Sequence, residues 1–232
     1  IRSKKYNDFY KSYFINKKLL IPLVTAKIAI SKDYQSINKK GKWITNETSR
    51  KIVHLLRNRY DCILSTSKTI NKDNSLLNCR IEGLNNNKPD LFIVDLKLKL
   101  KKKLSIIKHL RFRKIYLITY KNNTNKTLEY KKLGYKIILI EKLVDKNDFK
   151  SLYKKIYKKG YSRMLIESGL TFLNKLLINK IIHDLYIFKS NTNLGKNGKN
   201  NDTIKYLKHI SPKLVTINLK GDNLFKKDFN YV

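Results

Sequence analysis

The chain has 232 residues, 41% of them hydrophobic, and its formal net charge is +35. This length and apolar content suit one large domain or two small ones. We expect no membrane-spanning helix, because no apolar run approaches the ~20 residues that cross a bilayer, and the N-terminus lacks a basic-then-apolar signal sequence. Cys62 and Cys79 stand in no metal-binding or disulfide spacing. We therefore expect a cytoplasmic protein with no metal site and no membrane partner.

The strong positive charge raises the hypothesis of a nucleic-acid-binding protein. Most of the excess positive charge comes from lysines, which are scattered over all the expected elements. The sequence is also rich in Asn, Ile and Tyr, a composition that indicates an AT-rich coding sequence. The chain has no arginine-rich arm, zinc-finger spacing or RNP-like aromatic motif. We expect no nucleic-acid partner, although the charge would still attract phosphorylated anionic ligands. The alternative predicts binding to DNA or RNA that depends steeply on salt.

Residues 1–20 are basic and aromatic with a helical spacing, and we expect them to form a linker or tail before the main domain at 21–232. Because the chain opens with Ile instead of Met, we expect that it has been cut or processed. From Pro22 onward, short apolar runs alternate with amphipathic segments, as in an α/β domain. This alternation suits a mostly parallel central sheet with helices on both faces. The expected strands are 23–30, 62–64, 91–94, 115–119, 137–140, 164–166 and 184–188, and the expected helices are 46–60, 148–159 and 169–179.

The helix at 46–60 shows how the local rules apply. It begins from a cap at Thr45 or Asn46, with Glu47 in the first turn, and its apolar face should pack on the sheet while its charges stay outside. The other expected segments are a polar loop containing Thr69 and Asp73, a solvated surface connection at 97–103, a loop at 190–202 and closing antiparallel strands at 214–219 and 224–232.

Residues 43–80 contain the parts of a site for a phosphorylated, planar ligand. They include an aromatic residue, Trp43, and two separated arginines, Arg57 and Arg80. A guanidinium suits a phosphate because its planar fork makes paired, charge-assisted bonds that lysine cannot make. The polar loop with Thr69 and Asp73 follows a strand in the same stretch. Arginines on a solvated helix face are the plainer interpretation of this pattern.

Two further features suggest chemistry. The strand-to-helix turn at 167–171 places backbone amides at a helix N-terminus, which forms a ready anion site, and Gly169 permits close approach of a phosphate. Ligands of open α/β sheets bind outside the carboxyl ends of the strands, where this turn lies. Lys27 lies in an apolar strand and would be costly to bury unpaired. An ordinary strand-to-helix turn and an edge-strand lysine that points to solvent are the alternatives.

The order and spacing of these motifs resemble the reductase domain of the riboflavin-biosynthesis deaminase-reductase family, which has the dihydrofolate-reductase fold. The family pattern is roughly K-x-A-x-S-x-D-G, W-I-T, a helix ending in L-R, D-A-I-L, a T-x-x-x-D loop and L-x-x-R. A second block, MLIESG at 164–169, resembles the family's strand–Glu–x–Gly–helix turn. The residues that match the first pattern are Lys27, Ala29, Ser31, Asp33, Trp43, Ile44, Thr45, Leu56, Arg57, Asp61, Cys62, Ile63, Leu64, Thr69, Asp73, Leu77 and Arg80.

The resemblance implies one α/β domain of dihydrofolate-reductase-like topology that reduces 5-amino-6-(5-phosphoribosylamino)uracil with NADPH, by hydride transfer to C1′ of the ring-opened substrate. We also expect a homodimer. Bifunctional members carry an N-terminal zinc deaminase that needs H-x-E and P-C-x-x-C motifs; neither occurs, so we expect the deaminase domain to be absent from this chain. The implied site residues are Lys27 and Glu167 for catalysis, Ala29, Trp43, Thr69, Asp73, Gly169, Leu170 and Thr171 for the cofactor, and Arg57, Leu77, Arg80 and Glu167 for the substrate.

The chain departs from the family pattern at three positions. Tyr34 stands where the family has Gly, Gly41 aligns near a substrate-contacting Ser, and Leu96 replaces a Ser suited to the cofactor. A non-catalytic, degenerate copy is therefore one alternative, and a same-fold reductase of a pterin or folate is another. An unphosphorylated substrate would leave Arg57 and Arg80 without a partner.

Overall fold

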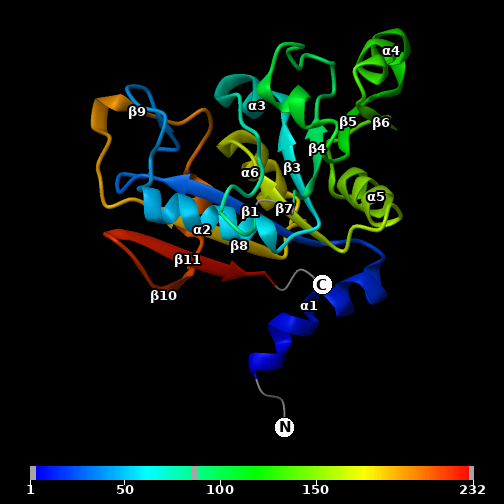
Figure 1. Cartoon of the computed structure of the whole chain (residues 1–232). Coiled ribbons are helices and arrows are strands. Elements are labelled where there is room, and N and C mark those ends of the chain that lie inside the picture. Colours follow the sequence, from blue (N-terminus) through cyan, green and yellow to red (C-terminus); the bar gives the residue numbers. More distant parts are fainter. Residues whose placement is uncertain (1–3, 85–87, 230–232) are drawn as a thin grey trace.

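The computed structural model describes residues 4–84 and 88–229, and in this part of the chain helices pack against both faces of a central sheet (Figure 1). Local sequence sets the element ends: Asn46 accepts a hydrogen bond from the Ser49 amide and caps the helix that follows. The helices are α1 (Lys4–Leu19), α2 (Glu47–Asn58), α3 (Ser67–Asp73), α4 (Thr124–Lys132), α5 (Lys146–Tyr157), α6 (Leu170–Ile178) and α7 (Lys205–His209), with short 3-10 turns η1 (Ser105–His109), η2 (Lys121–Asn123) and η3 (Gly195–Asn197). The strands are β1 (Leu23–Ile30), β2 (Ile37–Asn38), β3 (Cys62–Thr66), β4 (Asp90–Val94), β5 (Ile115–Tyr120), β6 (Lys136–Ile140), β7 (Arg163–Glu167), β8 (Asp184–Lys189), β9 (Gly198–Lys199), β10 (Lys213–Leu219) and β11 (Asp222–Asp228).

The described strands form one nine-stranded sheet, in the order β10-β11-β8-β1-β7-β3-β4-β5-β6, and a small second sheet of β2 and β9. The strands from β8 to β6 in this order are parallel, whereas β11 and β10 are added antiparallel. The predicted mostly parallel sheet with antiparallel closing strands is confirmed. Residues 230–232 of the last expected strand lie outside the described residues. Because β1, β7 and β3 are neighbours and parallel, their carboxyl ends meet at one edge, where ligands of such sheets bind.

Alternate residues of each strand divide between two hydrophobic layers. In β4, Phe92 and Val94 pack in the same cluster as apolar residues of α5 and α6, whereas Leu91 and Ile93 pack in the cluster that holds Leu56 of α2. Each fully buried Leu, Ile or Phe side chain stabilises the fold by about 1.5–3 kcal/mol. Helices therefore cover both faces, as the alternation of apolar and amphipathic segments predicts.

The segment expected to be a linker or tail forms α1, which is anchored to the sheet. Lys11 makes ion pairs with Asp184, at the start of β8, and with Asp228, at the end of β11. Ile15 on the same helix is only 6% exposed and joins the core. Residues 10–19 are therefore held against the domain by both charge and burial.

The polar loop expected to contain Thr69 and Asp73 is a helix instead, α3. The Thr66 hydroxyl accepts a hydrogen bond from the Thr69 amide and caps its start, and Asn74 ends it with φ of 45°. Ile70 is fully buried under the helix. The prediction was wrong because a helix this short carries one core residue, and the polar residues around Ile70 hide the period.

The segment at 97–103 was expected to be solvated, which is correct for its lysines and wrong for its leucines. Leu98 and Leu100 are 8% and 2% exposed, while Lys97, Lys99 and the following lysines point outward. The Asp95 carboxylate accepts hydrogen bonds from the Lys99 and Leu100 amides, at 2.8 and 2.7 Å, and so fixes the turn that buries the leucines.

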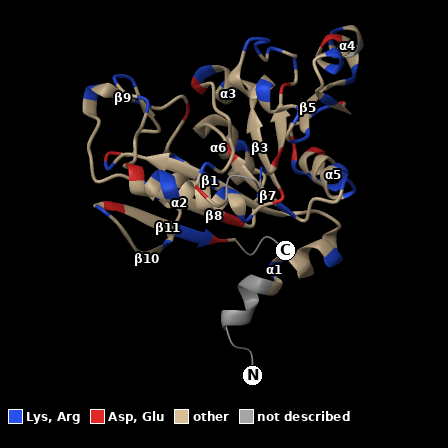
Figure 2. Cartoon of the chain, in the orientation of Figure 1, with Lys and Arg blue, Asp and Glu red and all other residues tan. Residues whose placement is uncertain are grey.

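Basic residues are spread over helices, strands and loops rather than gathered on one element (Figure 2). The distribution agrees with the scatter of lysine along the sequence. In the described part of the chain, no helix has the length and apolar character needed to cross a bilayer.

The burial of Leu100 gives a test of the corrected fold. Replacing Leu100 with Ala should lower the free energy of unfolding by about 2–5 kcal/mol, because a buried leucine leaves a cavity. Replacing the exposed Lys103 with Ala should change it by no more than about 0.5 kcal/mol. Urea titration of both variants measures the difference, and equal, small changes would mean that the segment is solvated after all.

Candidate active site

Lys27 lies in the interior of the sheet beside Glu167. β1 is flanked by β7 and β8, and Lys27 is in register with Glu167 on β7. Residues in register on neighbouring strands present their side chains to the same face, and here the Lys27 ammonium lies 3.9 Å from Glu167 Oε2. It also lies 5.6 Å from the centre of the Phe188 ring. The edge-strand alternative for Lys27 is therefore wrong.

Arg57 makes a two-pronged ion pair with Glu167. Its Nε donates to Oε1 at 2.6 Å and its Nη2 donates to Oε2 at 3.0 Å. Arg57 is 9% exposed and Glu167 7%, so this charge-assisted pair lies away from water. The expectation that α2 keeps its charges outside is wrong at Arg57. This residue, in the last turn of α2, points inward because it pairs with the buried Glu167 carboxylate.

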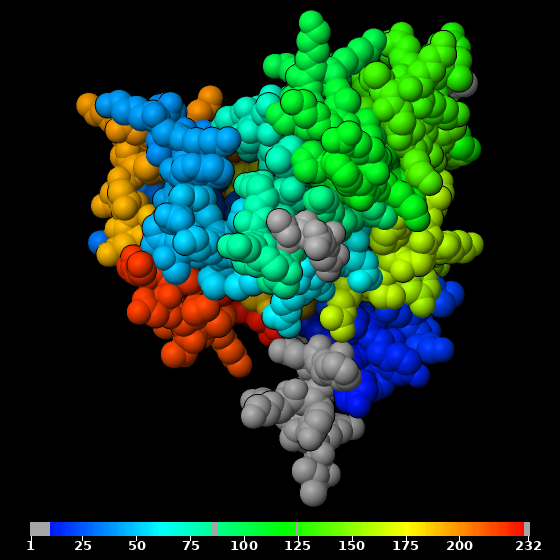
Figure 3. All heavy atoms as spheres, in the orientation of Figure 1, coloured from blue at the N-terminus to red at the C-terminus, as the bar shows by residue number. Residues whose placement is uncertain are grey.

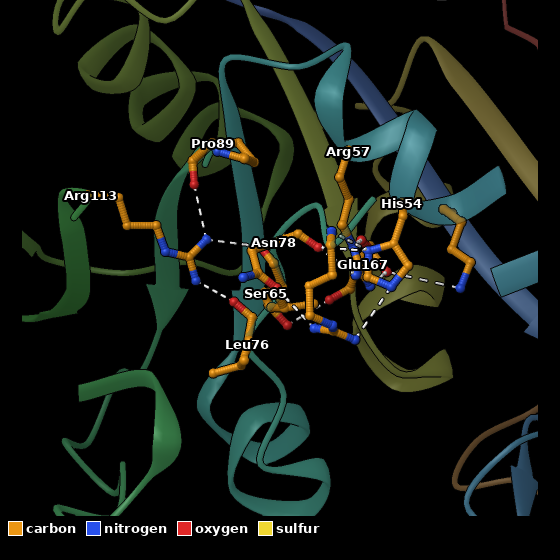
Figure 4. Close-up of polar contacts among 11 residues, drawn as sticks. His54, Arg57, Ser65, Leu76, Asn78, Pro89, Arg113 and Glu167 are labelled. Carbon is orange, nitrogen blue, oxygen red and sulfur yellow. Dashed lines mark hydrogen bonds and ion pairs between the residues drawn. The ribbon is translucent and has the colours of Figure 1, made fainter. Parts of the chain in front are cut away.

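The segment from Leu77 to Arg80 completes the cluster (Figure 4). The Asn78 carbonyl accepts a hydrogen bond from Arg57 Nη1 at 3.1 Å, and His54 Nδ1 lies 3.0 Å from the same oxygen. Arg80 Nη1 donates to Asn78 Oδ1 at 2.9 Å, and Arg80 Nη2 lies 3.3 Å from His54 Nε2. Leu77 is buried and has φ of 48°. Arg57 and Arg80, separated by 23 positions in sequence, are thus joined through Asn78 and His54.

The ionisation of the cluster follows from its burial and its crowded cations. Burial lowers the pKa of Lys27, and Glu167 opposes that shift. Burial acts to raise the pKa of Glu167, but Arg57 and Lys27 together bring it below its ordinary value. Burial and the neighbouring Arg57 and Arg80 lower the pKa of His54 to about 4, so its ring is neutral at pH 7. Burial and Arg57 also lower the pKa of Arg80.

At neutral pH the cluster therefore has an excess of positive charge. Arg57 and Arg80 supply two guanidinium cations, and Glu167 supplies one carboxylate. Even with Lys27 left out of the count, two minus one leaves a surplus of one positive charge. A phosphate is a ligand of opposite charge.

Helix α6 begins at Leu170, three residues after Glu167, and the space beside its N-cap is open. Gly169 caps it without a side-chain hydrogen bond, and a Cβ built at Gly169 would meet no atom within 4 Å. Thr171 is exposed, whereas Leu170 is 2% exposed and packs in the core. The open space beside Gly169 lets a ligand approach the backbone of this turn, and a helix N-terminus favours an anion, so the residues present fit a cofactor diphosphate. Ala29, also predicted to contact the cofactor, lies on β1 opposite Phe188.

The remaining predicted cofactor residues lie apart from the Glu167 cluster. Among the described residues, no hydrogen bond or ion pair joins Trp43, Thr69 or Asp73 to that cluster. Trp43 is 51% exposed and lies between Lys42 and Arg50, whose charged groups are 5.1 and 4.8 Å from its ring centre. Thr69 lies in the first turn of α3, within 3.0 Å of the Thr66 hydroxyl.

The Trp43 segment and the end of α3 nevertheless approach each other. Burial raises the pKa of Asp73, and the nearby Lys72 and Lys42 cations oppose the shift. Lys42 precedes Trp43 in the chain, so the two segments are close enough to interact. Between the light-blue segment that leads into α2 and the teal segment around α3, the space-filling view shows a hollow (Figure 3).

The departures from the family pattern have local explanations. Tyr34 has φ of 63°, a conformation that glycine adopts readily, yet the turn still closes because Asp33 accepts hydrogen bonds from Ser31 and from the Leu194 and Gly195 amides. These bonds, led by the one from Ser31, lower the pKa of Asp33 to about 2.

The other two departures remove hydroxyl groups from the site. A Cβ at Gly41 would lie 2.9 Å from the Asn38 amide, so Asn38 fills the space that a serine there would need. Leu96 packs against the core instead of offering a hydroxyl.

His54 and Asn78 are site residues that the sequence analysis missed. His54 lies three positions before Arg57, a spacing that places both on one side of a helix, and this was a usable signal. Asn78 acts through its backbone carbonyl and its side chain at once, and nothing in the sequence indicates that combination. Ser65 is another such residue, since its hydroxyl donates to the Glu167 carbonyl at 2.6 Å and fixes the end of β7.

Fold and site together define an α/β protein with a buried lysine–glutamate–arginine group beside an open helix N-terminus, at the carboxyl edge of a parallel sheet. Residues 22–206 match the model of the family described as the RibD C-terminal domain, and the chain belongs to this family. The family predicted from the order of the motifs is confirmed.

Two curated relatives are both described as riboflavin biosynthesis protein RibD. The protein from Buchnera aphidicola subsp. Baizongia pistaciae is 28% identical over 212 residues, covering 85% of this chain and 55% of the relative. The protein from Actinobacillus pleuropneumoniae is 22% identical over 184 residues, covering 78% and 48%. The chain thus spans about half the length of the curated relatives it matches.

Solved structures share the fold. Acinetobacter baumannii RibD matches with a TM-score of 0.76 and 21% identity, over 95% of this chain and 61% of the other. The Saccharomyces cerevisiae riboflavin biosynthesis reductase Rib7 matches with a TM-score of 0.70 and 20% identity, over 97% of this chain and 99% of the other. The predicted fold class, the α/β fold of these reductases, is confirmed.

The buried ion pair predicts a large and specific stability effect. Replacing Glu167 with Gln keeps the shape but leaves Arg57 and Lys27 without their counter-charge, and should lower the free energy of unfolding by about 3–5 kcal/mol. The matched control is Glu47→Gln, which removes an exposed carboxylate paired with Lys51 and should leave unfolding unchanged. Denaturant titration at pH 7 compares them, and similar midpoints for both variants would contradict the buried pair.

Proposed function

We propose that this chain is an oxidoreductase that uses NADPH to reduce 5-amino-6-(5-phosphoribosylamino)uracil to 5-amino-6-(5-phosphoribitylamino)uracil in riboflavin biosynthesis. The observation that carries the proposal is the Lys27–Glu167–Arg57 cluster, in which Arg57 and Glu167 are buried, with Arg80 at its rim and more cations than carboxylates. The surplus favours a phosphorylated substrate over a pterin or folate without phosphate. Retention of the costly buried charges argues against a non-catalytic copy.

In this proposal the arginines bind the substrate phosphate. A guanidinium has five N–H donors, and Arg57 uses three of its nitrogens on Glu167 and Asn78, which leaves donors for a ligand. Arg80 is exposed and its guanidinium is aligned by Asn78 and His54. Leu77 would pack against the substrate, and Glu167 would accept hydrogen bonds from it while holding Arg57.

NADPH, when bound, supplies the hydride. The Gly169 turn, with Leu170 contributing its backbone and Thr171 its exposed side, would bind the cofactor diphosphate, and Ala29, Trp43, Thr69 and Asp73 would contact the rest of the molecule. Lys27 would donate a proton near the reacting carbon, because its lowered pKa makes the ammonium a better acid, and Glu167 would keep it oriented. A homodimer and a cytoplasmic location are further predictions of this proposal.

Binding of NADPH should raise the melting temperature of the protein. A ligand bound only by the folded state stabilises it by about 2.7 kcal/mol at a hundred times its Kd. Gly169→Ala is the matched variant: its backbone angle and free space accept a Cβ, but that Cβ would occupy the proposed diphosphate space. Without NADPH, the variant and the wild type should have the same melting temperature. With NADPH, the melting temperature of the variant should rise less than that of the wild type. The proposed cofactor site would be contradicted if NADPH left the melting temperature of the wild type unchanged, or if it raised the melting temperatures of the wild type and the variant equally.

Arg80 gives the test of the substrate site. Arg80→Ala should remove a charge-assisted contact of roughly 1.5–3 kcal/mol, which corresponds to about tenfold or more in kcat/KM. The NADPH-induced rise in melting temperature should not change. Replacing the exposed Lys102 and Lys103 with Ala is the control and should leave turnover intact. If the lysine pair and Arg80 have equal, small effects on reduction, the phosphate is not bound where we propose.

A further inference from the structure

Arg113, just before β5, is a buried arginine that the proposed reaction does not use. It is 6% exposed. Its Nη1 donates to the carbonyls of Leu77, at 2.8 Å, and Pro89, at 3.0 Å, and its Nη2 donates to the carbonyl of Leu76. Among the described residues no carboxylate lies within ion-pair distance of it. Arg113 is thus a buried cation whose partners are backbone carbonyls of a single connection, the one between α3 and β4.

Such a cation is a costly way to stabilise a fold. Burial lowers the pKa of Arg113 to about 10, which Asp90 only partly opposes. Apolar residues of similar volume often stabilise a core as well as buried charges do. What a guanidinium adds is geometry, because its rigid planar fork reaches several acceptors at fixed angles. The geometry here is imposed on Leu76 and Leu77, which lie outside the helices and strands.

That segment is held from two sides by two buried arginines (Figure 4). Arg113 binds the carbonyls of Leu76 and Leu77, and Arg57 binds the next carbonyl in the chain, that of Asn78. Between them Leu77 keeps φ of 48°, a conformation unfavourable for a residue with a Cβ. Three consecutive carbonyls are therefore fixed, and the strained backbone at Leu77 is maintained by its surroundings.

The constraint reaches Arg80 directly. The Asn78 side chain accepts from Arg80 Nη1, and Arg80 Nη2 lies 3.3 Å from Nε2 of His54, whose Nδ1 lies 3.0 Å from the Asn78 carbonyl. A rotation of the backbone at Leu77 would move Asn78, and with it the guanidinium of Arg80. Arg113 itself is buried under Leu76 and Leu77, so it acts on a ligand only through these residues.

We propose that Arg113 is a positioning residue that fixes Leu76 and Leu77 so that Arg80 and Arg57 meet the phosphate of the substrate together. This inference rests on the proposed function, because it assigns that phosphate to Arg80. A purely structural Arg113 would affect folding and all substrates alike. A positioning Arg113 affects recognition of the phosphate alone.

The test uses Arg113→Lys, which keeps the charge but cannot span three carbonyls, and compares the phosphorylated substrate with its dephosphorylated counterpart. The ratio of their kcat/KM values should fall about tenfold or more in Arg113→Lys, as it does in Arg80→Ala. The double variant should show no further fall, because both changes remove the same recognition. The control is Arg111→Lys, two residues before Arg113 in the chain. Arg111 is exposed, its guanidinium lies over the Phe112 ring, and its replacement should keep the wild-type ratio.

Equal losses with both substrates, or an additive fall in the double variant, would overturn the inference. If Arg113→Lys does not fold, Arg113→Gln, which keeps an amide donor for the carbonyls, replaces it in the test. If neither variant folds, Arg113 serves the fold alone, and the inference is overturned. A wild type inactive on both substrates would count against the proposed function only. Stabilisation by inorganic phosphate, kept in Arg111→Lys and lost in Arg113→Lys, then supports positioning, and equal stabilisation overturns it.

Discussion

The Arg57–Glu167 ion pair is the interaction on which the site depends. It joins α2 to the end of β7 across the face of the sheet, and its second carboxylate oxygen lies near Lys27 on β1. Because the pair is buried, replacing either residue with a neutral one leaves the other as an unpaired charge in the protein interior. Arg57 then extends the constraint to Asn78. One carboxylate thus organises a strand, a helix and an irregular connection.

The surroundings of this pair explain why charge in this chain has two different meanings. Most lysines lie on the surface, spread over all elements (Figure 2), where they alter the solubility and the long-range field of the protein. Arg57 and Arg113 are instead buried, and Lys27 is half-buried, each beside specific oxygen atoms. The net charge of the sequence is dominated by the surface lysines, and it gives no indication of the cations that pair with specific oxygen atoms inside the protein.

Much of the fold was predictable from sequence, because strands with continuous apolar runs and helices with one apolar face leave clear periods. The site was predictable where a residue type is costly in its context: a lysine in the strand LVTAKIAI must have a partner. The identity of that partner, Glu167, comes from the register of β1 against β7, which no local pattern fixes. The helix α3 was missed because Ile70 alone marks its buried side. Asn78 and Arg113 were missed because their roles pass through backbone carbonyls, and any residue supplies those.

The central claim is that the cations gathered around Glu167 bind the phosphate of the substrate. A crystal structure of the chain with the phosphorylated substrate or product tests it most directly. We expect the phosphate within hydrogen-bonding distance of both Arg57 and Arg80, with the Arg57–Glu167 pair intact. A phosphate found instead in the lysine-lined hollow formed by Lys68, Lys72, Lys99 and Lys101 would contradict the claim.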